Sequence, residues 1–216
     1  DVYKRQIQKA IRSLDMGHDG FEYVEYTEDN LANPTDERLF QLYSAIKDGM
    51  DLDKIQKLTN IDKFFLYKIR NIVNFENEVT EEKLNDADFL RKAKQMGCSN
   101  KRLATLSNQT EEYIRNLLNR FNIKQSYKMV DTCAAEFEAK TPYYYSTYDS
   151  GNELKSSNKK KIVILGAGPI RIGQGIEFDY CCVHSSLALK EEGIETILIN
   201  NNPETVSTCL LYTSPS

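Results

Sequence analysis

The chain has 216 residues, of which 40% are hydrophobic and 28% charged, and its net charge is −4. This composition is typical of a globular protein with one large or two small domains, and the charge gives the whole molecule no electrostatic attraction to nucleic acid or to an anionic membrane. No apolar run approaches the roughly 20 residues of a membrane-spanning helix. The five cysteines are scattered without a C-x-x-C pair, which favours reduced thiols in the cytoplasm over a disulfide framework or a zinc site.

The first 30 residues contain a short helical pattern and then an extended stretch. The helical pattern ends at Gly17, and F-E-Y-V-E-Y follows at 21–26. A helix this short has too few partners to form a domain, so we expect residues 1–30 to be the tail of a preceding one.

Residues 33–125 have the apolar period of helices throughout and predict an all-helical bundle. Asn33 and Pro34 are expected to open the first helix. The helix after Asn60 has the widest apolar stripe, whose members we expect to be buried: Ile61, Phe64, Phe65, Ile69, Ile72 and Val73. Later helices are expected at 84–96, 100–106 and 110–121.

The segment 126–160 changes character. Tyrosines gather at 143–148 without any period, which indicates an ordered, partly buried connection. The Ser-, Asn- and Lys-rich run that follows them predicts an exposed linker and a domain boundary.

From Lys161 the pattern becomes α/β. An apolar strand at 161–165 leads into a glycine-rich loop, a helix at 183–192 and a second strand, which together predict one βαβ unit with a parallel strand pair. Because one such unit cannot cover both faces of its sheet, we expect the opening of a larger, doubly wound parallel sheet. The predicted fold class is therefore α + α/β.

The glycine loop does not match a nucleotide fingerprint. Gly166, Gly168 and Gly173 depart from the G-x-G-x-x-G spacing, and Asn200 to Asn202 stand where a dinucleotide site needs an acid. No G-K-[ST] follows either. Two interpretations stay open: Arg171 and Glu177 contact a small polar ligand, or they form a salt bridge beside a tight turn.

Several runs resemble the large subunit of carbamoyl phosphate synthetase. G-A-G-P-I-R-I-G-Q-G-I-E-F-D-Y-C-C and its continuation (166–208) are similar to the start of its second synthetase half, the pre-ATP-grasp region. V-D-T-C-A-A-E-F (130–137) is similar to the segment before it, L-T-N-I-D-K-F-F-L (58–66) to its helical oligomerisation domain, and I-Q-K-A-I-R-S-L (7–14) to the last helix of its first half.

This resemblance implies a domain division. Residues 1–30 are expected to be the tail of the carboxyphosphate synthetic domain, 31–157 the helical oligomerisation domain with its linker, and 158–208 the start of the carbamoyl phosphate synthetic domain. Residues 1–6 and 209–216 resemble nothing in the family, and we expect them to be extraneous.

The resemblance also implies a reaction for the parent enzyme, a ligase that makes carbamoyl phosphate from bicarbonate, glutamine-derived ammonia and two ATP, in arginine and pyrimidine synthesis. The implied cofactors are ATP and Mg²⁺ or Mn²⁺, bound by parts of the parent outside this chain, which is expected to be inactive alone. The implied partners are a small glutaminase subunit, the other synthetase domains and further copies through the helical domain.

The resemblance further implies a sealed tunnel between the two halves, because the carbamate intermediate decomposes in water. The resemblance makes Arg171, Gly175 and Glu177 candidates for the tunnel wall, and Asn202, Glu204 and Thr205 weaker candidates for the same cavity.

Two alternatives come from other classes of protein. Residues 99–124 are similar in pattern to a helix-turn-helix, but Glu111 and Glu112 would bring acidic charge to a phosphate-rich groove. The chain could also be purely a scaffold whose helices pack domains or subunits together.

Overall fold

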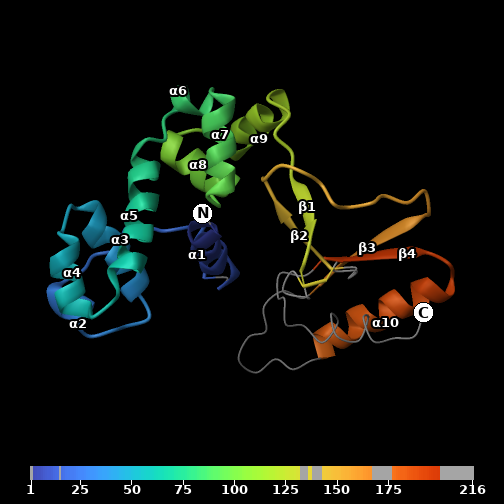
Figure 1. Cartoon of the computed structure of the whole chain (residues 1–216), viewed down its shortest axis with the longest axis horizontal. Helices are drawn as coiled ribbons and strands as arrows, with labels where there is room; N and C mark the ends of the chain where they lie inside the picture. Colours follow the sequence, from blue (N-terminus) through green and yellow to red (C-terminus); the bar gives the residue numbers. More distant parts are fainter. Residues whose placement is uncertain (1, 15, 132–135, 138–142, 167–176, 200–216) are drawn as a thin grey trace. The chain divides into compact units, whose positions relative to one another are not determined.

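The computed structural model describes residues 2–14, 16–131, 136–137, 143–166 and 177–199. The chain forms two compact units, Asp1–Gln125 and Ser126–Ser216. In its described part the first unit is helical, whereas the second has two small sheets and a helix (Figure 1). This order of elements confirms the predicted fold class.

The helices of the first unit are short and follow closely on one another. They are α1 (Val2–Ser13), α2 (Glu28–Ala32), α3 (Arg38–Lys47), α4 (Leu52–Thr59), α5 (Lys63–Asn77), α6 (Glu81–Leu84), α7 (Ala87–Gln95), α8 (Asn100–Ser107) and α9 (Glu111–Arg120). Most begin at a side chain that accepts a hydrogen bond from the first turn, as Asp51, Asp86 and Thr110 do.

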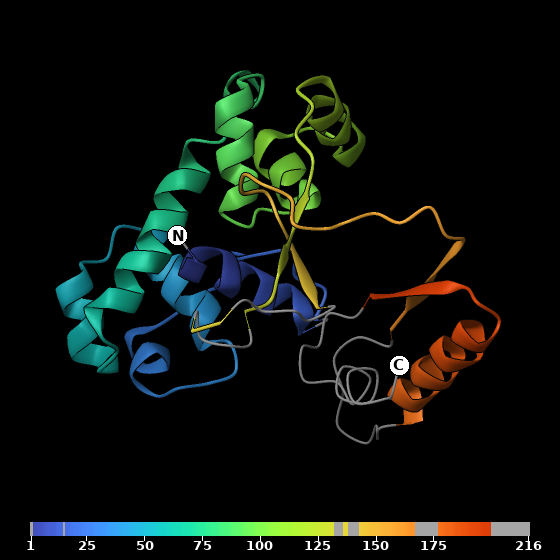
Figure 2. The ribbon, with the colours of Figure 1, turned by 45° about the vertical axis from the view of Figure 1, so that its right-hand side comes forward.

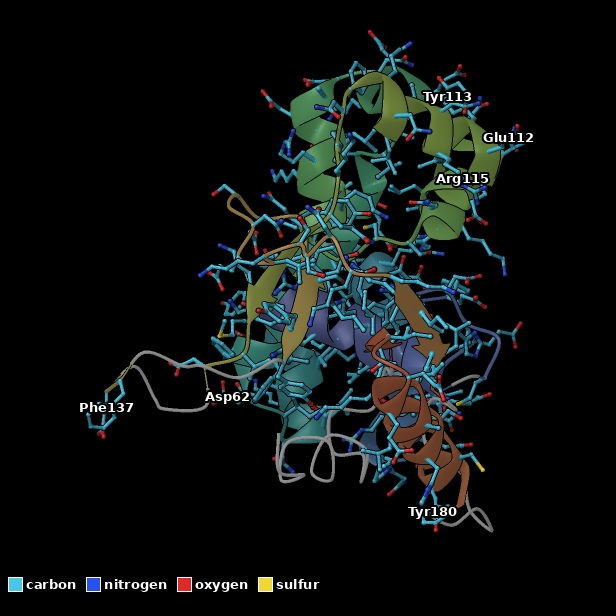
Figure 3. All side chains as sticks on the ribbon, turned by 90° about the vertical axis from the view of Figure 1, so that its right-hand side faces the viewer. Asp62, Glu112, Tyr113, Arg115, Phe137 and Tyr180 are labelled. Atoms are coloured by element: carbon cyan, nitrogen blue, oxygen red, sulfur yellow. The ribbon has the colours of Figure 1, made fainter. Side chains whose placement is uncertain are left out.

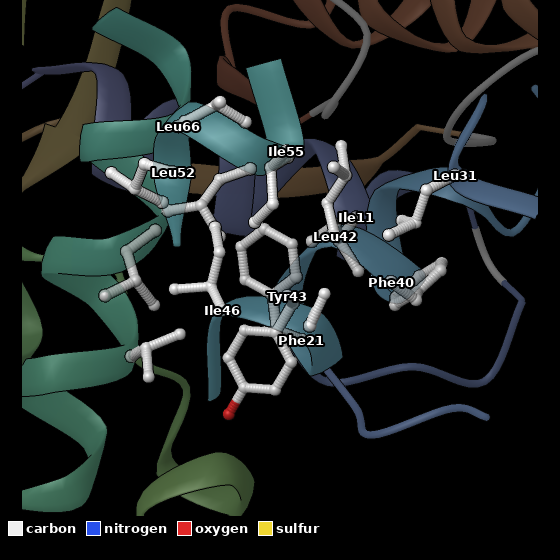
Figure 4. Packing of buried hydrophobic residues seen from close by; sticks show 14 residues of the cluster. Ile11, Phe21, Leu31, Phe40, Leu42, Tyr43, Ile46, Leu52, Ile55 and Leu66 are labelled. Atoms are coloured by element: carbon white, nitrogen blue, oxygen red, sulfur yellow. The ribbon is translucent and has the colours of Figure 1, made fainter. Parts of the chain in front are cut away.

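The longest helix of this unit, α5, runs from the cluster formed by α2 to α4 to the cluster formed by α6 to α9 (Figures 1 and 2). Its core side carries Leu66, Ile69 and Val73, which are at most 3% exposed. These side chains join a hydrophobic cluster with α1, α3 and α4 (Figure 4). Burial of such an apolar stripe is the main source of stability for helices of this length.

The extended stretch at 21–26 belongs to this core. Phe21 is fully buried, and its ring stacks on that of Tyr43 with the centroids 5.0 Å apart. The Val24 backbone N–H donates to Ser44 Oγ at 2.9 Å. The stretch has no regular secondary structure, and it is held by side chains of α3.

The prediction that Phe64 and Phe65 are buried was wrong, since they are 43% and 49% exposed. Leu66, which the predicted stripe omitted, is fully buried instead. It stands three residues before Ile69 and seven before Val73, the spacing of one helical face, whereas Phe64 is turned away from that face.

Two helix boundaries also differ from the prediction. The first predicted helix begins at Arg38, because Asn33 is the C-terminal cap of the short α2 that Thr27 caps at its start. The region 84–96 contains the end of α6 and all of α7, because the Asp86 carboxylate caps a new helix by accepting from the Asp88 N–H at 2.8 Å.

The second unit opens with a hairpin that the sequence did not predict. Strands β1 (Ser126–Met129) and β2 (Tyr144–Thr147) pair antiparallel. Along β1, the Tyr127 N–H donates to Asn152 Oδ1 at 2.9 Å and the Met129 N–H donates to Glu153 Oε2 at 2.7 Å. Side chains of the polar run therefore satisfy backbone groups that an edge strand leaves open.

The predicted βαβ unit is confirmed. Strands β3 (Lys161–Leu165) and β4 (Glu195–Ile199) are parallel neighbours, and α10 (Glu177–Glu191) connects them. The helix begins six residues before the predicted start at Val183.

Candidate functional site at the carboxyl edge of β3 and β4

The two parallel strands end side by side. Leu165 pairs with Ile199 in the last register position, and the Gly166 N–H donates to the Ile199 carbonyl at 2.7 Å. The chain therefore leaves both strands at one edge of the sheet. In open α/β sheets this carboxyl edge is where ligands bind.

The candidate residues follow this edge in the sequence. Arg171 and Gly175 come after β3 and lie outside the described residues, and so do the three weaker candidates after β4, Asn202, Glu204 and Thr205. Glu177 is the first residue of α10, and its side chain lies outside the described part as well. The strands thus bring the two candidate segments to a common edge, while the role of each residue stays a prediction.

Helix α10 packs on one face of the strand pair. Val183 is 3% exposed, and the hydroxyls of Ser186 on α10 and Thr196 on β4 are hydrogen bonded at 2.7 Å. Near the helix start, Cys182 Sγ lies 4.0 Å from the Leu165 carbonyl oxygen. These contacts hold the first turns of α10 beside the end of β3.

The opposite face of the sheet is open to solvent. Its alternating side chains Val163, Leu165, Ile197 and Ile199 are 51%, 75%, 40% and 55% exposed. Parallel sheets are normally covered on both faces. This apolar face therefore has the character of a surface that packs against a further protein layer.

The outer side of α10 carries an aromatic pair. The rings of Tyr180 and His184 are tilted against each other with centroids 4.0 Å apart, and Tyr180 projects from the N-terminal part of the helix (Figure 3). Among the described residues, no group of three or more His, Cys, Asp or Glu side chains could hold a metal ion.

The helical unit contains a buried polar cluster that the sequence analysis missed. Arg102 on α8 donates to both carboxylate oxygens of Glu76 on α5, at 3.0 and 2.6 Å, and the Tyr43 hydroxyl donates to Glu76 Oε2 at 2.6 Å. One signal was available: Glu76 stands three residues after Val73, so it continues the buried face of α5.

Charge and burial reinforce this cluster. Burial raises the pKa of the Tyr43 hydroxyl, and the Glu76 carboxylate raises it further. For Arg102, desolvation acts to lower the pKa, but the hydrogen bonds and the charge of Glu76 outweigh it, so that the pKa is raised. The bidentate pair ties α8 to α5, and Tyr43 ties both to α3.

A second cluster attaches α1 to the turn between α7 and α8. Gln8 Nε2 donates to the Met96 carbonyl at 3.2 Å, and Arg12 donates to the Gly97 carbonyl at 2.8 Å. Beneath this turn, burial lowers the pKa of Lys94 to about 8 and raises that of the Cys98 thiol to about 11. Gly97 has φ +93°, and a Cβ at this position would meet the Arg5 Cα at 3.0 Å.

Residues 2–122 match the family model described as the carbamoyl-phosphate synthetase large chain, oligomerisation domain. Residues 158–213 match the carbamoyl phosphate synthase preATP-grasp domain. The first match falls within the unit Asp1–Gln125 and the second within the unit Ser126–Ser216. Within the described residues, none of the helices is long and apolar enough to cross a membrane.

Three archaeal proteins named carbamoyl phosphate synthase large chain illustrate the similarity. That of Methanobrevibacter smithii is 97% identical over 207 residues, that of Methanothermobacter thermautotrophicus 59% over 205, and that of Archaeoglobus fulgidus 47% over 221. These alignments cover 95–96% of this chain but only 19–20% of each relative. The chain thus spans about one fifth of their length.

The chain thus combines a helical unit with a parallel βαβ unit, and each contains the match to one of the two family models. The chain belongs to the carbamoyl-phosphate synthetase large chain family, because the oligomerisation-domain model alone matches more than half of it.

Proposed function

We propose that this chain is the central part of a large subunit that makes carbamoyl phosphate from bicarbonate, glutamine-derived ammonia and two ATP, for arginine and pyrimidine synthesis. Residues 1–30 are the tail of the carboxyphosphate synthetic domain, 31–157 the oligomerisation domain with its linker, and 158–208 the start of the carbamoyl phosphate synthetic domain. The family matches and the high identity to named large chains support the proposed parent protein, and the preATP-grasp match supports the division near residue 158.

The chain's own part in the reaction is to wall the passage of carbamate. The observation that carries this role is the common edge of β3 and β4, from which both candidate segments start. Carbamate is short-lived in water, so a wall that excludes water is a chemical requirement of the reaction.

Within this wall, Gly175 leaves the bore open because it has no side chain. Arg171 and Glu177 guide a small anion without trapping it, because attraction by the guanidinium is balanced by the nearby carboxylate. Asn202, Glu204 and Thr205 line the same cavity from the segment after β4.

The helical unit is the scaffold that associates with further copies and with other synthetase domains, and the small glutaminase subunit supplies ammonia. ATP and Mg²⁺ or Mn²⁺ bind in other parts of the longer protein. We place the enzyme in the cytoplasm, in keeping with the free cysteines Cys98, Cys181 and Cys182.

The nucleic-acid alternative finds no support. The α9 helix buries Ile114, Leu117 and Leu118 in its own unit, while Glu112 and Arg115 point away from the bundle (Figure 3). Glu111 pairs with Arg115 at 3.4 Å, so an acidic first turn stands where a recognition helix would meet phosphates.

The passage role is tested in the intact synthetase with Arg171→Ala and Glu177→Ala, each beside a control at the far end of α10, Lys190→Ala or Glu191→Ala. We expect the two site variants to consume more ATP for each carbamoyl phosphate formed, because carbamate escapes, while the controls keep the normal ratio. If the ratio of ATP consumed to carbamoyl phosphate formed is unchanged in both site variants, the passage role is wrong and the loop is only a structural turn.

A further inference from the structure

The first turns of α5 expose a group of aromatic side chains. Phe64, Phe65 and Tyr67 are 43%, 49% and 43% exposed, and the rings of Phe64 and Phe65 meet edge to face with centroids 5.4 Å apart. Large aromatics gathered on one surface are typical of the centres of protein interfaces, where they are enriched.

This aromatic group is also cationic. Lys68 Nζ lies 4.8 Å from the centroid of the Phe64 ring, and the Arg70 guanidinium lies 4.6 Å from that of Tyr67. Along α5 no acid precedes Glu76, which is buried against Arg102. Residues 54–70 together hold five basic side chains and one acidic side chain.

The segment that precedes residues 54–70 has the opposite charge. Residues 22–53 hold nine acidic and two basic side chains. Some acids are paired within the unit, as Glu28 is with Lys54 and Asp53 with Lys63. Asp36 and Glu37, which precede α3, are exposed, and no ion pair is found for them among the described residues.

We infer that the aromatic and basic surface of α5 (Phe64, Phe65, Tyr67, Lys68 and Arg70) binds the acidic α2–α3 segment, around Asp36 and Glu37, of a second copy of this chain. The inference rests on the proposed association of the helical units and names the surface that carries it. The two surfaces occur on every copy and have opposite charge, so two copies related by a twofold axis form the contact twice.

A charge-reversal experiment tests this pairing by sedimentation of the full chain. Arg70→Glu and the double variant Asp36→Lys, Glu37→Lys should each raise the dimer dissociation constant at least tenfold. An equal mixture of the two variants should restore association, because in the mixed dimer the two reversed surfaces meet in one contact and the two unaltered surfaces meet in the other. Phe65→Ser should also weaken the dimer at least tenfold, since exposed aromatics at an interface centre contribute strongly.

Matched controls lie away from the surface. Arg91→Glu reverses an exposed charge on α7, and Phe137→Ser removes an aromatic side chain that is 76% exposed in the second unit. Both should dimerise like the wild type, and circular dichroism should show unchanged helix content in every variant.

The possible failures are distinguishable. If the wild-type chain and the intact synthetase stay monomeric at all concentrations, the proposed association through the helical unit is wrong. If the wild type associates but Arg70→Glu and Phe65→Ser associate equally well, or the mixture restores nothing, the association uses another surface and this inference alone is overturned.

Discussion

The helical unit and the β3–α10–β4 region bury their apolar side chains to different extents. In the helical unit, large apolar side chains from α1 to α9 are fully buried, and even its Glu76–Arg102 ion pair is enclosed and hydrogen bonded. In the β3–α10–β4 region, Val183 is the one apolar side chain buried among the described residues, and one face of the sheet is open to solvent. The first region is stabilised from within, whereas the second depends on what packs against it.

This contrast separates two uses of apolar residues. A leucine at the centre of α5 stabilises the fold, whereas a leucine at the end of β3 is a contact surface for another layer.

Breaking the buried ion pair should have the largest effect. Glu76→Ala leaves the Arg102 guanidinium buried without its carboxylate, and we expect a loss of about 3–5 kcal/mol in the free energy of unfolding, measured by urea titration of the chain. The control is Glu78→Ala, which removes an exposed carboxylate paired with Lys83 at 3.1 Å and should cost at most about 1 kcal/mol. Equal losses of unfolding free energy in the two variants would show that the buried ion pair stabilises the fold no more than an exposed one.

The same substitution in the two regions should give different results. Leu66→Ala removes a fully buried side chain and should cost about 2–5 kcal/mol. Leu165 is 75% exposed, so Leu165→Ala should change the unfolding free energy by no more than about 0.5 kcal/mol. A loss at Leu165 as large as that at Leu66 would contradict an open sheet face.

Stability should depend on Lys94 in mildly alkaline solution. Burial lowers the pKa of Lys94 to about 8 in the folded chain from the ordinary 10.5, so the folded chain loses this proton at lower pH than the unfolded chain. The unfolding free energy should therefore rise with pH from about 8 towards 10.5, by on the order of 1 kcal/mol between pH 8 and 9 relative to Lys94→Met. Parallel pH profiles of wild type and Lys94→Met would show that Lys94 is not desolvated.

Loss of a helix cap should have a small effect. Thr110 Oγ1 accepts a hydrogen bond from the Tyr113 N–H at 3.1 Å, and Thr110→Ala should cost about 1 kcal/mol, with Thr110→Ser close to wild type. Thermal unfolding followed by circular dichroism measures both, and a serine variant as unstable as the alanine variant would exclude the cap as the cause.

Local chemistry explains which parts of the fold could be predicted. The helices after Asn60, at 100–106 and at 110–121 have side-chain caps that agree with their apolar periods, and the strand 161–165 is one apolar run, so the sequence predicted these elements. The β1–β2 hairpin was missed because its strands have only four residues each and are separated by 14 residues. No short turn sequence therefore indicates that they pair.

The site and the buried cluster were predictable to different degrees. Parallel pairing of β3 and β4 followed from the βαβ pattern, and it brings the segments of Arg171 and Asn202 to one edge. The contact between Glu76 and Arg102 joins residues 26 positions apart on different helices, so neither residue could be assigned its partner from the sequence. The exposure of Phe64 depends on which side of α5 is covered by the neighbouring helices, and periodicity alone cannot predict that side.

The most direct test of the central claim is the coupling of partial reactions in an intact synthetase that carries Gly175→Leu. The added side chain should obstruct the carbamate passage, so that bicarbonate-dependent ATP hydrolysis and glutamine hydrolysis continue while carbamoyl phosphate formation falls more than tenfold. Ser185→Leu, which adds similar bulk on the exposed side of α10, should form product normally. Product formation by Gly175→Leu at the wild-type rate, with no excess ATP consumption, would contradict the claim that this loop walls the passage.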